Sequence, residues 1–290
     1  MTCFPPARLR GLLFGLASVF SACFSCLLAG LMSAEDDPRA KQRLDVMQAA
    51  VDSLEPMSAD LKPKAALTMA SKPLHRYSDP TRGGVKEESA NNVLLDAGVW
   101  RLGIEGRPTA LVTLELYRAP DKTHLLSYEF LSLTKVKFSL KHKTEDVRWD
   151  ATASGLELKP LPDAPKPAGT SAARLTQLRQ LARRFAAKET FNNEPVECRL
   201  IAQPIDRYHS EAEKITDGAI FALANGTNPE IGIVLEAEEE RWRYGVLRLT
   251  SAQSAVTLDG SQVAAYERFQ SRGRRDGPYN SGLQKIDLGK

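Results

Sequence analysis

The sequence contains few cysteines. Three of the four, Cys3, Cys23 and Cys26, lie within residues 1–34, so Cys198 stands alone in the rest of the chain. That excludes a disulfide within the remaining chain and a cysteine-rich metal site. The four histidines are scattered, without the His-x-x-x-His or Glu-x-x-His spacing that places two metal ligands on one helix face. We therefore expect no metal ion, and a fold stabilised by its hydrophobic core.

Short motifs typical of enzymes are also missing. The sequence has no Gly-x-Ser-x-Gly elbow, no phosphate-binding glycine loop and no dinucleotide fingerprint. Net charge is small as well, because 37 basic residues face 36 acidic ones beyond residue 34. Nucleic-acid binding depends on neutralising many phosphates, so a nucleic-acid partner is not expected. The sequence predicts no cofactor and gives an enzymatic activity no positive support.

The N-terminal segment has no acidic residue and carries a long apolar run. Two arginines precede the run at residues 12–32, which is typical of an export signal. At 21 residues the run is also long enough to span a bilayer, and Met32 occupies the position three residues before a cleavage point after Ala34, where a small residue is preferred. Lipid attachment at Cys23 is a third interpretation. We predict that residues 1–34 are a signal peptide or an N-terminal membrane anchor. The body would then be exported to the periplasm or cell envelope, or secreted, either free or tethered through residues 12–32.

One short motif occurs twice. "KPLHRYSD" at 72–79 and "QPIDRYHS" at 203–210 share Pro-apolar-x-Arg-Tyr at an offset of 131 residues. At the same offset, two apolar stripes with helical spacing align: Leu44, Met47, Ala50, Val51 and Leu54 with Leu175, Leu178, Leu181, Ala182 and Phe185. Such spacing predicts an amphipathic helix before each motif.

The segments after the motif also match. At an offset of 121, "DAGVWRLGIEGRPTALVTLE" (96–115) aligns with "DGAIFALANGTNPEIGIVLE" (217–236), and at 116, "YEFLSLT" (128–134) aligns with "YGVLRLT" (244–250). Each set predicts consecutive antiparallel strands whose apolar residues alternate on one face. A slip of one residue would reverse those faces, so agreement over three strands indicates two copies of one unit.

The two copies define the predicted domains. Residues 36–150 form the first repeat and 170–269 the second, each a helix followed by a β-meander. Proline-rich residues 151–169 read as a linker, and turn-rich residues 270–290 as a flexible tail. A helix on one face of an antiparallel sheet is an α+β arrangement. We expect an α+β fold made by internal duplication, with the two halves packed together.

Three segments carry a resemblance to a known family. They are "RYSDPTRG", "PAGTSAARLTQLRQLARRF" and "DGAIFALANGTNPEIGIVLEA", and the similarity extends over most of residues 70–270. The chain resembles a family of uncharacterised exported bacterial proteins of the planctomycete type. The resemblance implies export and a shared fold. It implies no activity and supplies no catalytic residues.

Polar residues that recur in both copies are candidates for ligand binding, because a cleft between the halves would bring them together. The candidates are Arg76, Tyr77, Arg207, Tyr208, Glu115 and Glu236. The alternative interpretation is structural. Arginine and tyrosine would pack their apolar stems and leave their polar ends in water, while Asp96 and Asp217 would begin the hairpins.

Glu115 and Glu236 could act as an acid and a base if they met across such a cleft. The alternation places both opposite the apolar stripe, in solvent unless the other half covers that face. Glu129 has no carboxylate counterpart, since Gly245 occupies the matching position. Cys198 falls in an apolar stretch and is expected to be a buried packing residue.

These observations favour an exported cell-envelope protein that acts as a non-catalytic binding or interaction module for an unidentified envelope ligand or protein. The alternative is an exported hydrolase with a site between the two repeats. A third interpretation is a structural component tethered to the membrane through residues 12–32.

Overall fold

The structure, a computed structural model, describes residues 38–61, 64–79, 92–143, 146–191 and 193–288. The predicted export signal at residues 1–34 lies outside the described residues. The chain divides into two units, 1–41 and 42–290. Among the described residues, no helix combines the length and the hydropathy needed to cross a membrane.

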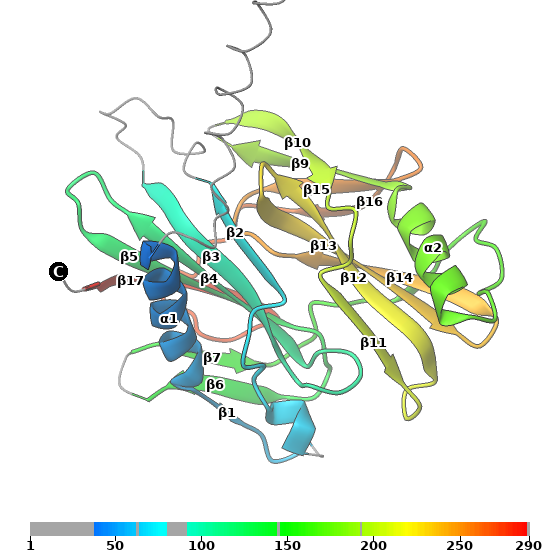
Figure 1. Ribbon diagram of the computed structural model, residues 1–290, viewed down its shortest axis with the longest axis horizontal. Helices are drawn as coiled ribbons and strands as arrows, with labels where there is room; N and C mark the ends of the chain where they lie inside the picture. The colour runs from blue at the N-terminus through cyan, green and yellow to red at the C-terminus, as the bar shows by residue number, and fades with distance from the viewer. Residues whose placement is uncertain (1–37, 62–63, 80–91, 144–145, 192, 289–290) are drawn as a thin grey trace, which may run out of the picture. The chain divides into compact units, whose positions relative to one another are not determined.

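Antiparallel β-sheets dominate the fold (Figure 1). The described residues form seventeen strands, two α-helices, α1 (Pro38–Asp52) and α2 (Ser171–Ala182), and a short 3-10 helix, η1 (Lys64–Leu67). The predicted combination of helices and antiparallel strands is present, but the α+β class is corrected to a β-rich one. The sequence pattern missed several short strands because each offers only a few alternating residues.

The first half of the chain, residues 42–151, builds four strands of a five-stranded sheet and all of a three-stranded sheet. The five-stranded sheet has the order β17-β5-β4-β3-β2 and consists of β17 (Tyr279–Ile286), β5 (His124–Ser132), β4 (Ala110–Arg118), β3 (Val93–Leu102) and β2 (His75–Asp79). The three-stranded sheet has the order β1-β6-β7 and consists of β1 (Leu54–Met57), β6 (Phe138–His142) and β7 (Arg148–Ala151).

The second half, residues 170–269, builds most of a nine-stranded sheet. Its path runs β16-β15-β9-β10-β12-β13-β14-β8, and β11 pairs with β12 beside this path. The strands are β8 (Lys159–Pro160), β9 (Phe185–Phe191), β10 (Glu194–Leu200), β11 (Asp206–Ser210), β12 (Ile215–Asn225), β13 (Asn228–Glu238), β14 (Arg241–Arg248), β15 (Ser254–Leu258) and β16 (Ser261–Tyr266).

Each half has its own core between its helix and its sheets. In the first half, Met47 of α1 packs with the apolar residues of β3–β7, and Trp100 is fully buried there. In the second half, Leu178 of α2 packs with β9, β12, β13 and β15, and Phe221 is fully buried. The predicted alternation in β4 and β13 is confirmed: Ala110, Val112, Leu114 and Leu116 lie in the first core, and Ile231, Ile233, Leu235 and Ala237 lie in the second.

A third core joins the two halves and is called the inter-sheet layer here. It contains buried residues from both halves, among them Val99 and Leu111 of the first, and Ile220 and Val234 of the second. These residues come from the strand faces opposite to those that carry Trp100 and the other residues of the separate cores. The large sheets are therefore buried on both faces, which explains why β4 and β13 are almost continuously apolar.

The C-terminal segment differs from the prediction. Residues 270–290 were expected to be a flexible tail, but β17 pairs with β5 along eight residues, from Tyr279 opposite Leu131 to Ile286 opposite His124. The linker also contributes a strand, since β8 pairs with β14. Turn residues before β17 hid this strand from a composition-based reading. Each segment that follows one half therefore adds a strand to the sheet of the other half.

Between β1 and β2, η1 is followed by an isolated bridge from Met69 to Leu102. Cys198 is buried in β10, as expected for a packing thiol.

Candidate functional site

One aspartate in each half, on an inner strand of the large sheet, binds two arginines. Asp96 of β3 accepts hydrogen bonds from Arg76 (Nε–Oδ1 2.9 Å, Nη2–Oδ2 2.5 Å) and from Arg43 of α1 (Nε–Oδ2 3.1 Å). Both carboxylate oxygens of this buried side chain are thus paired with cations. The arrangement fastens α1 and β2 to the sheet.

The second half repeats this arrangement. Asp217 of β12 accepts from Arg207 (Nε–Oδ1 2.9 Å, Nη2–Oδ2 2.7 Å) and from Arg174 of α2 (Nε–Oδ2 2.9 Å). Hydrogen bonding to Asp217 raises the pKa of Arg207, as bonding to Asp96 raises that of Arg76. These aspartates therefore anchor a helix and a strand, which is a structural role.

Each half also buries a glutamate beside the tyrosine of its Arg-Tyr motif. The Tyr77 hydroxyl donates to Glu115 (Oη–Oε1 3.0 Å), and the Tyr208 hydroxyl donates to Glu236 (Oη–Oε1 2.7 Å). Burial raises the pKa of both tyrosines well above the ordinary value, and the neighbouring glutamate charge adds to this effect. Both tyrosines therefore remain protonated donors at neutral pH.

The second carboxylate oxygen distinguishes the two glutamates. Glu236 is bound in bidentate fashion by Arg107 of the first half (Nε–Oε1 2.7 Å, Nη2–Oε2 2.8 Å). The other oxygen of Glu115 accepts from the Tyr117 hydroxyl (Oη–Oε2 2.6 Å). Burial is the largest single effect and lowers the pKa of Arg107, but the hydrogen bonds and charge of Glu236, together with the charges of Glu213 and Tyr208, raise that pKa above its ordinary value, so the guanidinium stays charged.

Two further ion pairs extend the contact between the halves near Arg107. Arg107 also reaches Glu213 (Nη1–Oε1 2.9 Å) of the β11–β12 turn. Arg101 of β3 binds Asp206 of β11 (Nη1–Oδ2 2.8 Å), and both side chains are almost entirely buried. Arg101 also donates to the carbonyl oxygen of Gly106 (Nη2–O 2.6 Å), which holds the β3–β4 turn in place. These bonds fix one end of the interface between the halves.

Further buried carboxylates lie deeper in the inter-sheet layer. Burial raises the pKa of Glu129 well above its ordinary value, and the charges of Glu115 and Glu230 raise it further. The nearby Tyr279 also has a raised pKa, first because of burial and then because of the Glu129 charge. A carboxyl group in this environment is held in its neutral form over a wider pH range than an exposed one.

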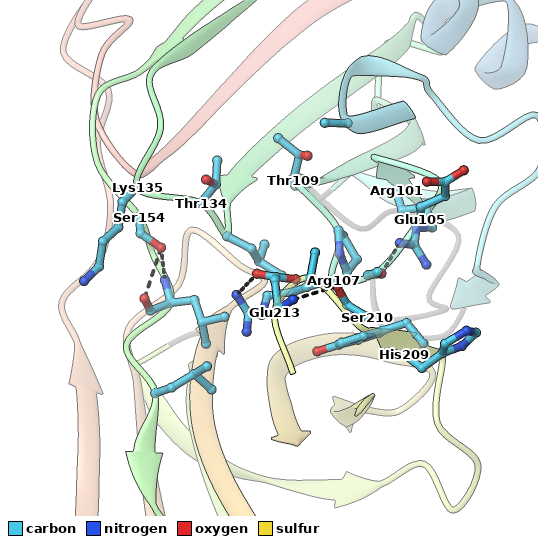
Figure 2. Close-up of a pocket in the computed structure, with 18 of the residues that line it drawn as sticks. Arg101, Glu105, Arg107, Thr109, Thr134, Lys135, Ser154, His209, Ser210 and Glu213 are labelled. Atoms are coloured by element: carbon cyan, nitrogen blue, oxygen red, sulfur yellow. Dashed lines mark hydrogen bonds and ion pairs between the residues drawn. The ribbon is translucent and has the colours of Figure 1, made fainter. Parts of the chain in front are cut away.

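A groove opens beside Arg107, where both halves meet (Figure 2). We call it the Arg107 groove. It has a volume of about 1460 Å³ and is lined by residues of the β3–β4 turn, the β5–β6 loop, the linker and the β11–β12 turn. Figure 2 shows Arg107 and Glu213 facing one another at its centre, with Arg101 and Glu105 to one side. The groove therefore exists only where the two halves are assembled.

The six predicted site residues fall into two groups. Arg207 and Tyr208 line the Arg107 groove, and Glu236 lies directly behind it, bound to Arg107. The other three, Arg76, Tyr77 and Glu115, make the matching contacts in the first half and do not line the groove. Arg207, Tyr208 and Glu236 therefore gather at the groove, whereas Arg76, Tyr77 and Glu115 do not.

Sequence reasoning missed several residues that define the site. Arg43 and Arg174 stand at the same 131-residue offset as the motif, so the repeat itself could have revealed them. Arg107 gave no such signal, because Asn228 occupies the matching position. Arg101 and Asp206 likewise match Ala222 and His75. Aligning one half with the other therefore does not identify the residues that form contacts between the halves.

Comparison of the chain with protein-family models, curated proteins and solved structures finds no match. The resemblance to exported planctomycete-type proteins therefore stays a prediction. In the part of the chain that the structure describes, no group of histidine, cysteine, aspartate and glutamate side chains is arranged to hold a metal ion.

Proposed function

We propose that the chain is a non-catalytic binding module made of two fused copies of one β-rich unit, and that it holds its ligand in the Arg107 groove. The observation that carries this proposal is the groove itself, because both halves line it and large concave sites at such junctions are where ligands commonly bind.

Strand register supports the fusion. In the first half Trp100 pairs with Val112, and 121 residues later Phe221 pairs with Ile233. The same irregularity interrupts both ladders, between Leu94 and Asp96 and between Ile215 and Asp217. Register is set along the whole length of a strand by its alternating pattern, so shared bulges at matching places favour common descent over coincidence.

The outer strands of the two halves also pair in matching register. β1 pairs with β6, and β9 with β15, so that Leu54 lies opposite His142 and Phe185 opposite Leu258. These pairs agree at the offsets of 131 and 116 that the sequence suggested. The order β1-β6-β7 in the first half also matches β9-β15-β16 in the second.

Contacts between the halves are reciprocal in two places. β8, which follows the first half, joins the sheet of the second, while β17, which follows the second half, joins the sheet of the first. The hairpin turn of each half also approaches the Arg-Tyr strand of the other half. Thr227 donates to the carbonyl oxygen of Ser78 (Oγ1–O 2.7 Å), and a Cβ atom on Gly106 would lie 3.2 Å from the Cβ atom of Ser210. Such exchange is what fusion of a symmetric dimer would leave behind.

The state of the polar groups supports binding over catalysis. Arg107 directs its guanidinium nitrogens to Glu236 and Glu213, and the Tyr208 hydroxyl donates to Glu236. A general acid or base must reach the proton that it transfers, but Glu236 is fully buried behind its partners. These groups are therefore suited to shaping a rigid groove.

An exported hydrolase is the second candidate. The observation that favours it is that Glu115 and Glu236 both face the inter-sheet layer beside tyrosine donors. Glu115→Gln and Glu236→Gln, made separately, should leave any hydrolysis of peptide, ester or glycoside substrates unchanged under the binding proposal. Loss of a measurable hydrolysis with either variant would replace that proposal by the enzymatic one.

Export to the cell envelope remains part of the proposal and is supported by residues 1–34 of the sequence. Sequencing the N-terminus of the exported protein would test it. A start at Glu35 would support a cleaved signal and exclude the membrane tether, whereas an intact N-terminus in the membrane fraction would support the anchor.

Blocking the groove tests the binding role. Ala212 is exposed and lines the Arg107 groove, whereas Ala265 is exposed on β16 outside it. Ala212→Trp should abolish binding of at least one probe in a panel of fluorescent basic, acidic and neutral peptides and cell-wall glycan fragments, and Ala265→Trp should leave it unchanged. Equal binding by both variants and the unaltered chain would place the ligand elsewhere and contradict the proposal.

A further inference from the structure

The exposed charges of the Arg107 groove are mainly negative. Its exposed charged lining residues are Glu105, Glu157, Glu211, Glu213, Lys135 and Arg207. Arg207 is bound to Asp217, which leaves Lys135 as the only exposed cation of this lining without an ion pair among the described residues. Likewise, within the described residues, the side chains of Glu105 and Glu211 form no ion pair.

The buried and half-buried arginines that line the groove are each paired with a carboxylate. Arg101 is bound to Asp206, Arg107 to Glu236, and Arg243 to Glu238 (Nη1–Oε1 3.2 Å). An incoming anion would therefore meet cations that already have carboxylate partners, as well as the exposed glutamates. A cationic ligand would find glutamates available for pairing, and this charge complementarity selects it.

Size and apolar surface narrow the ligand further. A volume of about 1460 Å³ exceeds the range of roughly 300–1,000 Å³ that is typical of pockets for small molecules. Ile104, next to Glu105, keeps 50% of its surface exposed, and Leu133 and Leu156 contribute to the wall. Apolar positions next to acidic ones suit a chain in which apolar and basic side chains alternate, as they do on an extended peptide.

We propose that the Arg107 groove binds an extended basic segment of another polypeptide, with Glu105 and Glu211 pairing with its cationic side chains and Ile104 contacting its apolar ones. This inference rests on the proposed function, since it names the ligand class of the same groove. Phosphorylated or other acidic ligands would be repelled by the same glutamates.

The test uses two fluorescein-labelled synthetic peptides, one of alternating lysine and valine and one of alternating glutamate and valine. Fluorescence anisotropy with the purified chain should detect binding of the lysine peptide and no binding of the glutamate peptide. Glu105→Gln/Glu211→Gln should weaken binding of the lysine peptide about tenfold, because two surface ion pairs are lost. Added salt should weaken binding to the unaltered chain more than to the double variant.

A matched control removes the same charge elsewhere. Glu55 and Glu194 are exposed on β1 and β10, outside the groove, so Glu55→Gln/Glu194→Gln should bind the lysine peptide as the unaltered chain does. Equal weakening by both double variants would mean that only net charge matters and would overturn the proposal. Absence of binding to the unaltered chain would overturn it as well.

The two proposals can fail separately. If the glutamate peptide or a neutral peptide bound and Ala212→Trp abolished that binding, the basic ligand class would be wrong and the groove would still be the binding site. If the lysine peptide bound equally to Ala212→Trp and to the unaltered chain, both the ligand site and the proposed function would be wrong.

Discussion

The buried glutamates of the two halves occupy matching positions but have different partners. Glu236 is held by Tyr208 and, across the interface, by Arg107. Glu115 is held by Tyr77 and Tyr117 within its own half. The tyrosine contact is common to both halves, so it belongs to the framework of each half. The arginine contact occurs once, at the point where the groove opens.

This difference shows which contacts maintain the framework and which make the two halves unequal. The Asp–Arg–Arg clusters and the Tyr–Glu pairs lie within one half and recur. The ion pairs made by Arg101 and Arg107 cross between the halves and do not recur. Changes at recurring contacts should therefore have similar effects in both halves, whereas changes at Arg107 should have no equivalent.

The largest effects are expected in the two separate cores. Trp100 and Phe221 occupy matching positions, and both are fully buried. Trp100→Ala and Phe221→Ala should each lower the free energy of unfolding by about 4 kcal/mol, because each leaves a large cavity. Denaturant unfolding of the variants measures this. A cost below about 1 kcal/mol for one of them would break the comparison between the halves.

The cross-half ion pair should come next. Arg107→Met leaves Glu236 buried without its cation and should cost about 3 kcal/mol. Asn228→Ala, at the matching position in the second half, should cost about 1 kcal/mol. Thermal and denaturant unfolding would compare them, and Arg107→Met/Glu236→Gln should recover part of the loss. Equal costs for Arg107→Met and Asn228→Ala would contradict the asymmetry.

Asp96 and Asp217 provide a test of equality between the two halves. Asp96→Asn and Asp217→Asn each weaken charged hydrogen bonds to two arginines and should each cost about 2 kcal/mol. Because the contacts match, the two costs should agree within about 0.5 kcal/mol. Chemical denaturation at neutral pH measures both. A clearly unequal pair of costs would indicate that the two clusters serve different purposes.

Glu129 provides the smallest and most specific test, because Gly245 occupies its matching position. Burial raises its pKa well above the ordinary value of 4.5, so the folded chain holds a proton that the unfolded chain releases. Stability from this group is present at low pH and is lost as pH rises through the raised folded-state pKa. Glu129→Gln should therefore stabilise the protein at about pH 8 and flatten the pH dependence of the free energy of unfolding above about pH 5.

The exposed Glu55→Gln serves as the control for that profile and should leave the pH dependence unchanged. A Glu129→Gln variant that unfolds at the same denaturant concentration as the unaltered chain at every pH would show that Glu129 does not titrate in this window.

Much of the central sheet was predictable from the sequence. The apolar alternation in β4 and β13 is long and strong. The two-residue period of a strand was therefore enough to place Leu114 and Leu235 on the side of the sheet that faces a core. The opposite face was harder to assign, because Glu115 and Glu236 look like ordinary exposed residues. They are buried only because the two sheets cover one another, which is a tertiary effect that no local pattern records.

The C-terminal strand and the groove were missed for related reasons. β17 contains Asn280, Ser281 and Gly282, which are poor strand formers, and it is held by pairing with β5. The groove depends on Arg107, which lies in a turn and reaches a glutamate 129 residues further along the chain. Both β17 and the groove depend on contacts between segments that lie far apart in the sequence. The periodicity of a single sequence therefore cannot predict them.

An experimental structure is the most direct test of the claim that two equal frameworks are joined and only one is bridged by arginine. Superposing residues 94–132 on residues 215–248 should bring Tyr77, Asp96 and Glu115 onto Tyr208, Asp217 and Glu236, with Arg107 bound to Glu236 and no ion pair at Glu115. A superposition that succeeds only after slipping one strand by a single residue would put these carboxylates on opposite faces and contradict the account.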